Sequence, residues 1–131
     1  MIVLDTHAWL WWVQDVAKLS PSQQARMAAE ETGGGLGVCA ISLWEIAKGV
    51  ELGKIKLPCP VEEWLALALA YPGVCLLPLT AAIAAESARL PGKFHRDPAD
   101  QLIVATARIL GCPLVTVDGK ILSYPHIDHV V

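Results

Sequence analysis

The sequence predicts an α/β protein with three layers, α/β/α, in which helices cover both faces of a central parallel sheet of four to five strands. Short apolar runs without polar alternation are typical of strands that are buried on both faces. Segments with helix signals separate these runs, and each is long enough for a right-handed crossover between parallel strands. The chain has 131 residues. We therefore expect a single domain, spanning residues 1–131, without disulfide or metal support.

The apolar runs define the expected strands. Four of them cover residues 1–4, 36–40, 74–77 and 114–117, and a fifth covers 127–131. The first run is apolar throughout and ends at Asp5. It is predicted to be a fully buried strand.

Capping signals define the expected helices. Ser20 to Gln23 form a capping-box pattern with proline at the first helical position, and predict a helix to Glu31, before three consecutive glycines. Ser42 and Glu45 repeat this pattern, so a helix is expected to begin there and to end near residue 53. Further helices are expected from residue 6, over 61–71 and 80–90, and from 97 to a glycine at 111.

Composition excludes several classes of protein. A net charge of −3 argues against a generally basic nucleic-acid coat. The four cysteines have no metal-binding spacing, and no signal peptide precedes the first strand, so we expect a reduced, cytoplasmic protein. Residues 64–85 carry no Asp, Glu, Lys or Arg. Because prolines and a glycine interrupt this stretch, no membrane span is expected.

Acidic residues lie near the carboxyl ends of the expected strands. Asp5 follows the first strand, Glu45 the second and Asp118 the fourth, while Asp97 and Asp100 open the helix before the fourth strand. Ligands of parallel α/β sheets bind at this edge. Converging carboxylates repel one another, so they need protons or a hard cation such as Mg²⁺ or Mn²⁺.

All of these acids except Asp5 also have a simpler interpretation. Glu45 and Asp97 have the spacing of helix caps, and Asp118 resembles an ordinary turn residue. Asp5 has no evident role in the core. The joint placement of the acids favours a functional site over these separate explanations.

Four segments then carry a family resemblance. They read IVLDTHAWLWW at 2–12, SLWEI at 42–46, HRDPADQLIVATAR at 95–108 and LVTVD at 114–118. In this order and spacing the chain resembles a PIN domain, and most of all the VapC-like ribonuclease toxins of prokaryotic toxin–antitoxin pairs. The resemblance covers nearly the whole chain.

The resemblance implies a site and an activity. By position, the metal ligands and catalytic acids would be Asp5, Glu45, Asp100 and Asp118, supported by Thr6, Ser42, Thr116 and, as a helix cap, Asp97. The implied activity is Mg²⁺- or Mn²⁺-dependent cleavage of RNA that leaves 5′-phosphate and 3′-hydroxyl ends. The implied partners are a cognate antitoxin protein and a second copy of the chain in a homodimer.

Two positions differ from the pattern of the family and leave an alternative function open. Many relatives carry arginine where this chain has Gln101 and Val117, so a catalytically weak RNA- or partner-binding module is the competing interpretation. A phosphohydrolase with Asp5 as nucleophile is a third. It has less support because His7 stands where such enzymes carry a second acid. For His7 itself, a packing role is favoured over catalysis.

Basic and aromatic residues are the remaining candidates for contacts with RNA or with a protein partner. Possible phosphate contacts are Lys48, Lys93 and Arg96, within basic runs that also contain Lys54, Lys56, Arg89 and His95. A solvated charged face explains these runs equally well. Trp11 or Trp12 is a candidate partner contact, with core packing as the alternative, and Trp44 and Trp64 are expected in the core.

Overall fold

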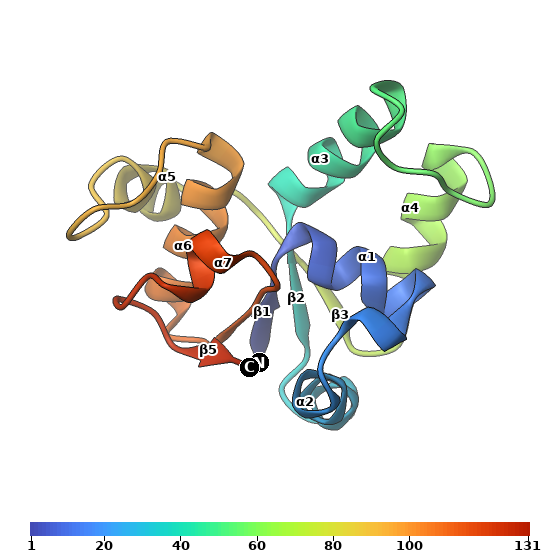
Figure 1. Cartoon of the computed structure of the whole chain (residues 1–131), viewed down its shortest axis with the longest axis horizontal. Coiled ribbons are helices and arrows are strands. Elements are labelled where there is room, and N and C mark those ends of the chain that lie inside the picture. The colour runs from blue at the N-terminus through green and yellow to red at the C-terminus, as the bar shows by residue number, and fades with distance from the viewer.

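A parallel sheet of five strands forms the centre of the molecule, as the computed structural model of residues 1–131 shows (Figure 1). The strands lie in the order β3-β2-β1-β4-β5, and every neighbouring pair is parallel. Their bounds are Ile2–Leu4 for β1, Leu36–Cys39 for β2, Val74–Leu77 for β3, Leu114–Val115 for β4 and His129–Val130 for β5. The predicted sheet is confirmed, with five strands.

Helices cover both faces of this sheet, which gives the predicted three layers (Figure 1). The helices are α1 (Thr6–Gln14), α2 (Pro21–Glu31), α3 (Ala40–Glu51), α4 (Val61–Leu69), α5 (Ala81–Ser87), α6 (Pro98–Leu110) and α7 (Gly119–Leu122), with a 3₁₀ turn, η1, at Val16–Lys18. Ile2 and Leu4 of β1 pack in one core cluster with α1, α2 and α4. Val3, between them, packs in a second cluster with α6 and α7. Successive side chains of a strand point to opposite faces, so one strand supports both layers.

Capping chemistry explains several helix boundaries. The capping box of α2 forms in both directions between Ser20 and Gln23. Asp97 caps α6 by accepting a hydrogen bond from the backbone N–H of Asp100, and Gly111 ends α6 in the left-handed conformation, with φ of 63°. Both predicted ends of this helix are confirmed. Asp97 therefore has the capping role expected of it.

The capping box predicted at Ser42 is wrong. Helix α3 begins two residues earlier, at Ala40, and Cys39 occupies its N-cap without a side-chain hydrogen bond. Ser42 and Glu45 therefore lie inside the helix, and Glu45 does not cap it. The pattern failed because the hydroxyl of Ser42 bonds to a side chain on another element. Tertiary contact has replaced the local one.

Smaller differences separate the expected elements from the observed ones. Helices α4 and α5 end two to three residues before their expected ends, and β4 and β5 contain two residues each. The expectation of a core position for Trp64 is confirmed, whereas that for Trp44 is wrong because its side chain is 58% exposed. Trp11 and Trp12 are half-buried against the core. All four cysteines are free.

The uncharged stretch at 64–85 is divided among α4, β3 and α5. No helix in the structure combines the length and the apolar character needed to cross a bilayer.

Candidate active site

The sheet order places the carboxyl ends of β1, β2 and β4 side by side. β1 lies between β2 and β4, and the strand order reverses at this point, since β2 and β3 extend to one side and β4 and β5 to the other. In open α/β sheets such a reversal leaves a crevice beyond the strand ends. Asp5, the N-cap of α1, directly follows β1, and Asp118, the N-cap of α7, lies three residues after Val115, the last residue of β4.

Asp5 is a buried carboxylate held by two donors. Its exposed fraction is 5%. Oδ1 accepts the backbone N–H of Thr6 at 2.8 Å, and Oδ2 accepts the hydroxyl of Thr116 at 2.7 Å. Burial nevertheless raises its pKa above the ordinary value, and the charge of Asp100 adds to that shift. The cost of burying this charge is what a cation would offset.

The hydroxyl of Thr116 connects two of the acids. It donates to Asp5 and accepts the backbone N–H of Asp118 at 3.1 Å. Oδ1 of Asp118 in turn accepts the backbone N–H of Lys120 at 2.8 Å, which caps α7. One hydroxyl on the end of β4 thus fixes both the side chain of Asp5 and the backbone of Asp118.

A second hydroxyl pair holds Glu45. The Thr6 hydroxyl donates to Oε1 of Glu45 at 2.5 Å and lies 2.8 Å from the Ser42 hydroxyl. Because the proton of Thr6 goes to Glu45, Ser42 must donate to Thr6. Thr6 and Ser42 are both buried. Burial raises the pKa of Glu45 to about 7, and the negative charges of Asp100 and Asp5 add to this rise.

Asp100, in the first turn of α6, has a partner that the sequence did not suggest. Its Oδ2 lies 2.6 Å from Nε2 of His95, in the loop that precedes the helix. Burial raises the pKa of Asp100 despite this hydrogen bond. Gln101 holds the same loop, since its side-chain amide donates to the carbonyl of His95 at 3.1 Å. Gln101, which stands where many relatives carry arginine, therefore supports the contact between His95 and Asp100.

Oxygen is the only donor type that these four acids and three hydroxyls present. That donor set fits Mg²⁺ or Mn²⁺. Nowhere in the structure do three His, Cys, Asp or Glu side chains lie close enough together to hold a metal ion. Mg²⁺ does not require three protein ligands, because it usually keeps several of its waters and binds one or two carboxylates directly.

The candidate phosphate contacts do not join this cluster. Lys48 forms an ion pair with Glu51 at 3.0 Å. Lys93 and Arg96 are exposed in the segment before α6, with no ion pair to any acid. Val117, the second position that differs from the pattern of the family, packs against the core cluster on the α1 side of the sheet.

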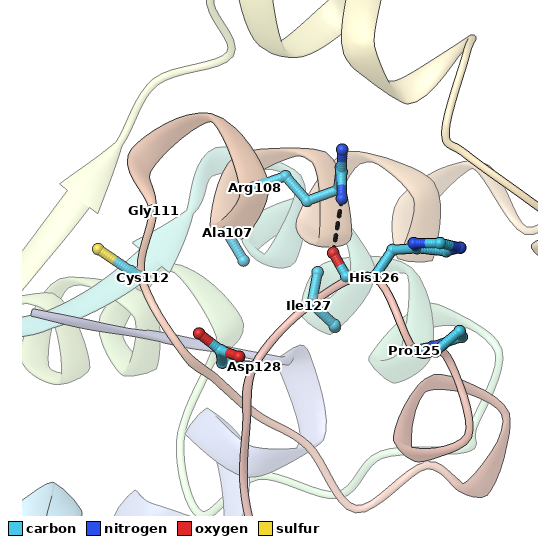
Figure 2. Close-up of a pocket in the computed structure, with 8 residues that line it drawn as sticks. All are labelled: Ala107, Arg108, Gly111, Cys112, Pro125, His126, Ile127 and Asp128. Carbon is cyan, nitrogen blue, oxygen red and sulfur yellow. Dashed lines mark hydrogen bonds between the residues drawn. The ribbon is translucent and has the colours of Figure 1, made fainter.

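A cavity of about 390 Å³ at the other end of α6 does not compete for the role (Figure 2). Arg108 lines it but is already bonded to Glu86 at 2.7 Å and to the carbonyl of His126 at 2.6 Å. Asp128 is its only acid. Eleven positions of helix separate Gly111 from Asp100, or about 16 Å, so this cavity lies away from the acids.

Comparison with known proteins now decides the family. Residues 2–127 match the profile of the PIN domain. The chain belongs to the PIN-domain family. Over 126 residues this PIN domain is 38% identical to Ribonuclease VapC22 of Mycobacterium tuberculosis, a match that covers 95% of this chain and 92% of the relative. The resemblance seen in the sequence is confirmed.

Solved structures share the fold. VapBC2 of Rickettsia felis, bound to a DNA fragment from its promoter, matches with a TM-score of 0.73 at 19% identity, over 98% of this PIN domain and 97% of that chain. DNA-bound VapBC of Salmonella typhimurium matches with a TM-score of 0.71 at 18% identity, over 98% and 97%. At such identities the likeness establishes the three-layer architecture alone.

Proposed function

We propose that this PIN domain is a metal-dependent endoribonuclease and the toxin of a toxin–antitoxin pair. The observation that carries the proposal is the placement of Asp5, Glu45 and Asp118 on three buried hydroxyls at the crevice of the sheet, with Asp100 close enough for its charge to raise the pKa of Asp5 and of Glu45. The ribonuclease named among its relatives and the VapBC pairs among its structural neighbours support the same activity and an antitoxin partner.

The acids would hold Mg²⁺ or Mn²⁺. When bound, such a cation lowers the pKa of water and stabilises charge on phosphate oxygens. Thr116 keeps Asp5 in place, and Thr6 keeps Glu45 in place, so little rearrangement is needed at either side chain. In the metal-free protein the pKa of Glu45 is about 7, and a bound cation would favour its ionised form, in which it would orient the attacking water.

His95 and Gln101 position Asp100. The ring of His95 packs on Phe94, with centroids 4.3 Å apart, and Phe94 packs edge-on against Tyr124. The hydroxyl of Tyr124 donates to the carbonyl of Pro91. These contacts hold the loop before α6 against the domain, and with it the group that bonds to Asp100.

Cleavage of total cellular RNA tests the proposal. Purified protein should cut RNA with Mg²⁺ or Mn²⁺, leave 5′-phosphate and 3′-hydroxyl ends, and lose the activity in EDTA and in Asp100→Asn. Asp128→Asn is the matched control, since that acid is exposed and lines the cavity at the far end of α6. It should cut like the wild type.

RNA that is bound but not cut, by folded protein with metal present, would favour the alternative of a catalytically weak binding module. Reverting Gln101→Arg would then be the first change to make. The proposed partners, a cognate antitoxin and a second copy of the chain, are tested by co-expression with the neighbouring reading frame and by the molecular mass in solution.

A further inference from the structure

A second pocket, of about 480 Å³, runs along α1. His7, Trp11 and Lys18 line it from α1 and η1, and Lys54 and Lys56 line it from the connector between α3 and α4. His7 stands at the end nearest the acids, two residues after Asp5, and its charge lowers the pKa of Asp5. His7 thus places one end of the pocket nearest to Asp5, while none of the four acids lines the pocket itself.

The wall that carries the lysines is held in place. Gln14 of α1 accepts the indole N–H of Trp64 at 2.9 Å and donates to the carbonyl of Lys56 at 3.4 Å. The backbone N–H groups of Lys54 and Ile55 donate to the carbonyl of Gly49. A Cβ at residue 49 would lie 2.5 Å from the end of the Ile55 side chain, so glycine permits this close packing.

The pocket carries excess positive charge in a protein whose net charge is −3. Its only acid is Asp15, which pairs with Lys18 at 3.9 Å. Lys54 and Lys56 are exposed and form no ion pair. Two uncompensated ammonium groups thus face a cavity whose lining includes His7, two residues from Asp5.

We propose that this pocket binds the RNA strand beside the bond that is cut, with Lys54 and Lys56 contacting its phosphates. The inference rests on the proposed function and names the surface that holds its substrate. From His7 to Gln14 the pocket follows α1 for about 10 Å, enough for a short stretch of single-stranded backbone. Trp11 adds an aromatic wall, and aromatic rings stack on bases without sequence preference.

RNA fits these observations better than an acidic peptide does. A strand that is cut at the acids would run from the pocket past His7 toward Asp5. A phosphate at that point would be compatible with a divalent cation held by the carboxylates, whereas a peptide carboxylate there would meet acids that already repel one another.

RNA binding is measured in EDTA, so that the contact with RNA is observed without its cleavage. A short fluorescent single-stranded RNA of mixed sequence is titrated with the full chain over a range of KCl concentrations. The test variant is Lys54→Gln/Lys56→Gln. The matched control, Arg26→Gln, removes one charge from an exposed position outside the pocket, and Lys54→Gln alone is its single-charge counterpart. Thermal unfolding of all the variants verifies that they fold.

The test variant should bind more weakly, and its plot of log K against log salt should be shallower by about 1.4, or about 0.7 for each lost phosphate contact. The control should keep the wild-type slope. The charge reversal Lys54→Glu/Lys56→Glu should weaken binding further.

Two results overturn the inference while leaving the proposed function intact. In the first, wild-type protein binds and cuts RNA and the test variant does so with the same affinity and slope. In the second, the test variant keeps RNA binding and loses capture of a co-expressed antitoxin, which assigns the pocket to a protein partner. Wild-type protein that neither binds nor cuts RNA would overturn both proposals.

Discussion

The carboxylates at the crevice are stabilised by hydroxyl groups rather than by cations of the protein. Asp5 and Glu45 each accept a threonine hydroxyl, from Thr116 and Thr6, and no lysine or arginine forms an ion pair with either. Their raised pKa values follow from burial, because few charges of opposite sign offset the loss of hydration. Without metal, this site therefore reduces the stability of the fold at neutral pH.

Because these carboxylates are buried without cationic partners, the stability of the fold should depend on pH in an unusual way. The folded pKa of Glu45 is about 7 against an ordinary value of 4.5, so the folded state binds the extra proton between these values. The contribution to stability is fully present below about pH 4.5 and is lost as the pH rises to about 7. Its size is at most about 3 kcal/mol, reduced by solvent screening. Thermal unfolding in EDTA should show Tm falling across this range.

Glu45→Gln is the matched variant, because the amide keeps an acceptor for Thr6 without the charge. Its Tm should fall less between those pH values, and the remaining fall should come from Asp5 and Asp100, whose pKa values are also raised. Parallel curves for the wild type and the variant would show that Glu45 does not titrate in this range.

At the scale of elements, α2 does more than cover the sheet. Gln23 completes the capping box, and its side-chain amide also donates to the carbonyl of Thr116 at 2.9 Å and to that of Val130 at 3.0 Å. It is 4% exposed. Gln23 thereby joins α2 to the ends of β4 and β5, and one of its two acceptors is the backbone of Thr116, whose hydroxyl holds Asp5.

Replacing Gln23→Leu should destabilise the fold by about 2–4 kcal/mol, because three buried polar partners lose their hydrogen bonds. Urea unfolding measures the change. Gln24→Leu, its neighbour, gives up one partly buried hydrogen bond to the carbonyl of Leu19, and should cost about 1 kcal/mol. Equal losses in the two variants would contradict the role assigned to Gln23.

At the scale of the whole molecule, the fold brings together groups far apart in the chain. The hydrogen bond from Thr116 to Asp5 joins residues separated by 111 positions, and that from Thr6 to Glu45 joins residues separated by 39. A cation bound across these elements would therefore stabilise the folded state as a unit.

Mn²⁺ at about 100 times its Kd should raise the free energy of unfolding by about 2.7 kcal/mol, which differential scanning calorimetry detects as a higher Tm. At a fixed Mn²⁺ concentration the increment should be larger above about pH 7, since ligation needs ionised carboxylates and the Kd therefore falls as the pH rises. Asp118→Asn should reduce the increment, and Asp128→Asn should retain it. An increment that Asp118→Asn leaves unchanged would exclude Asp118 as a ligand.

The sequence was sufficient for the architecture. Buried parallel strands require continuous apolar runs, and helix ends require local caps, so β3, the start of α2 and both ends of α6 were predictable from neighbouring residues. It also predicted that acids lie after the carboxyl ends of the strands, as Asp5 does after β1 and Asp118 after β4.

Only the tertiary structure decided which groups the acids contact. The spacing of Ser42 and Glu45 predicts a cap because a short pattern reflects partners close in sequence, whereas their actual partner, Thr6, comes from another element. The contact of His95 with Asp100 and the pocket along α1 likewise depend on where loops pack. Local propensity determines elements through adjacent residues, while a site depends on long-range packing that no short pattern encodes.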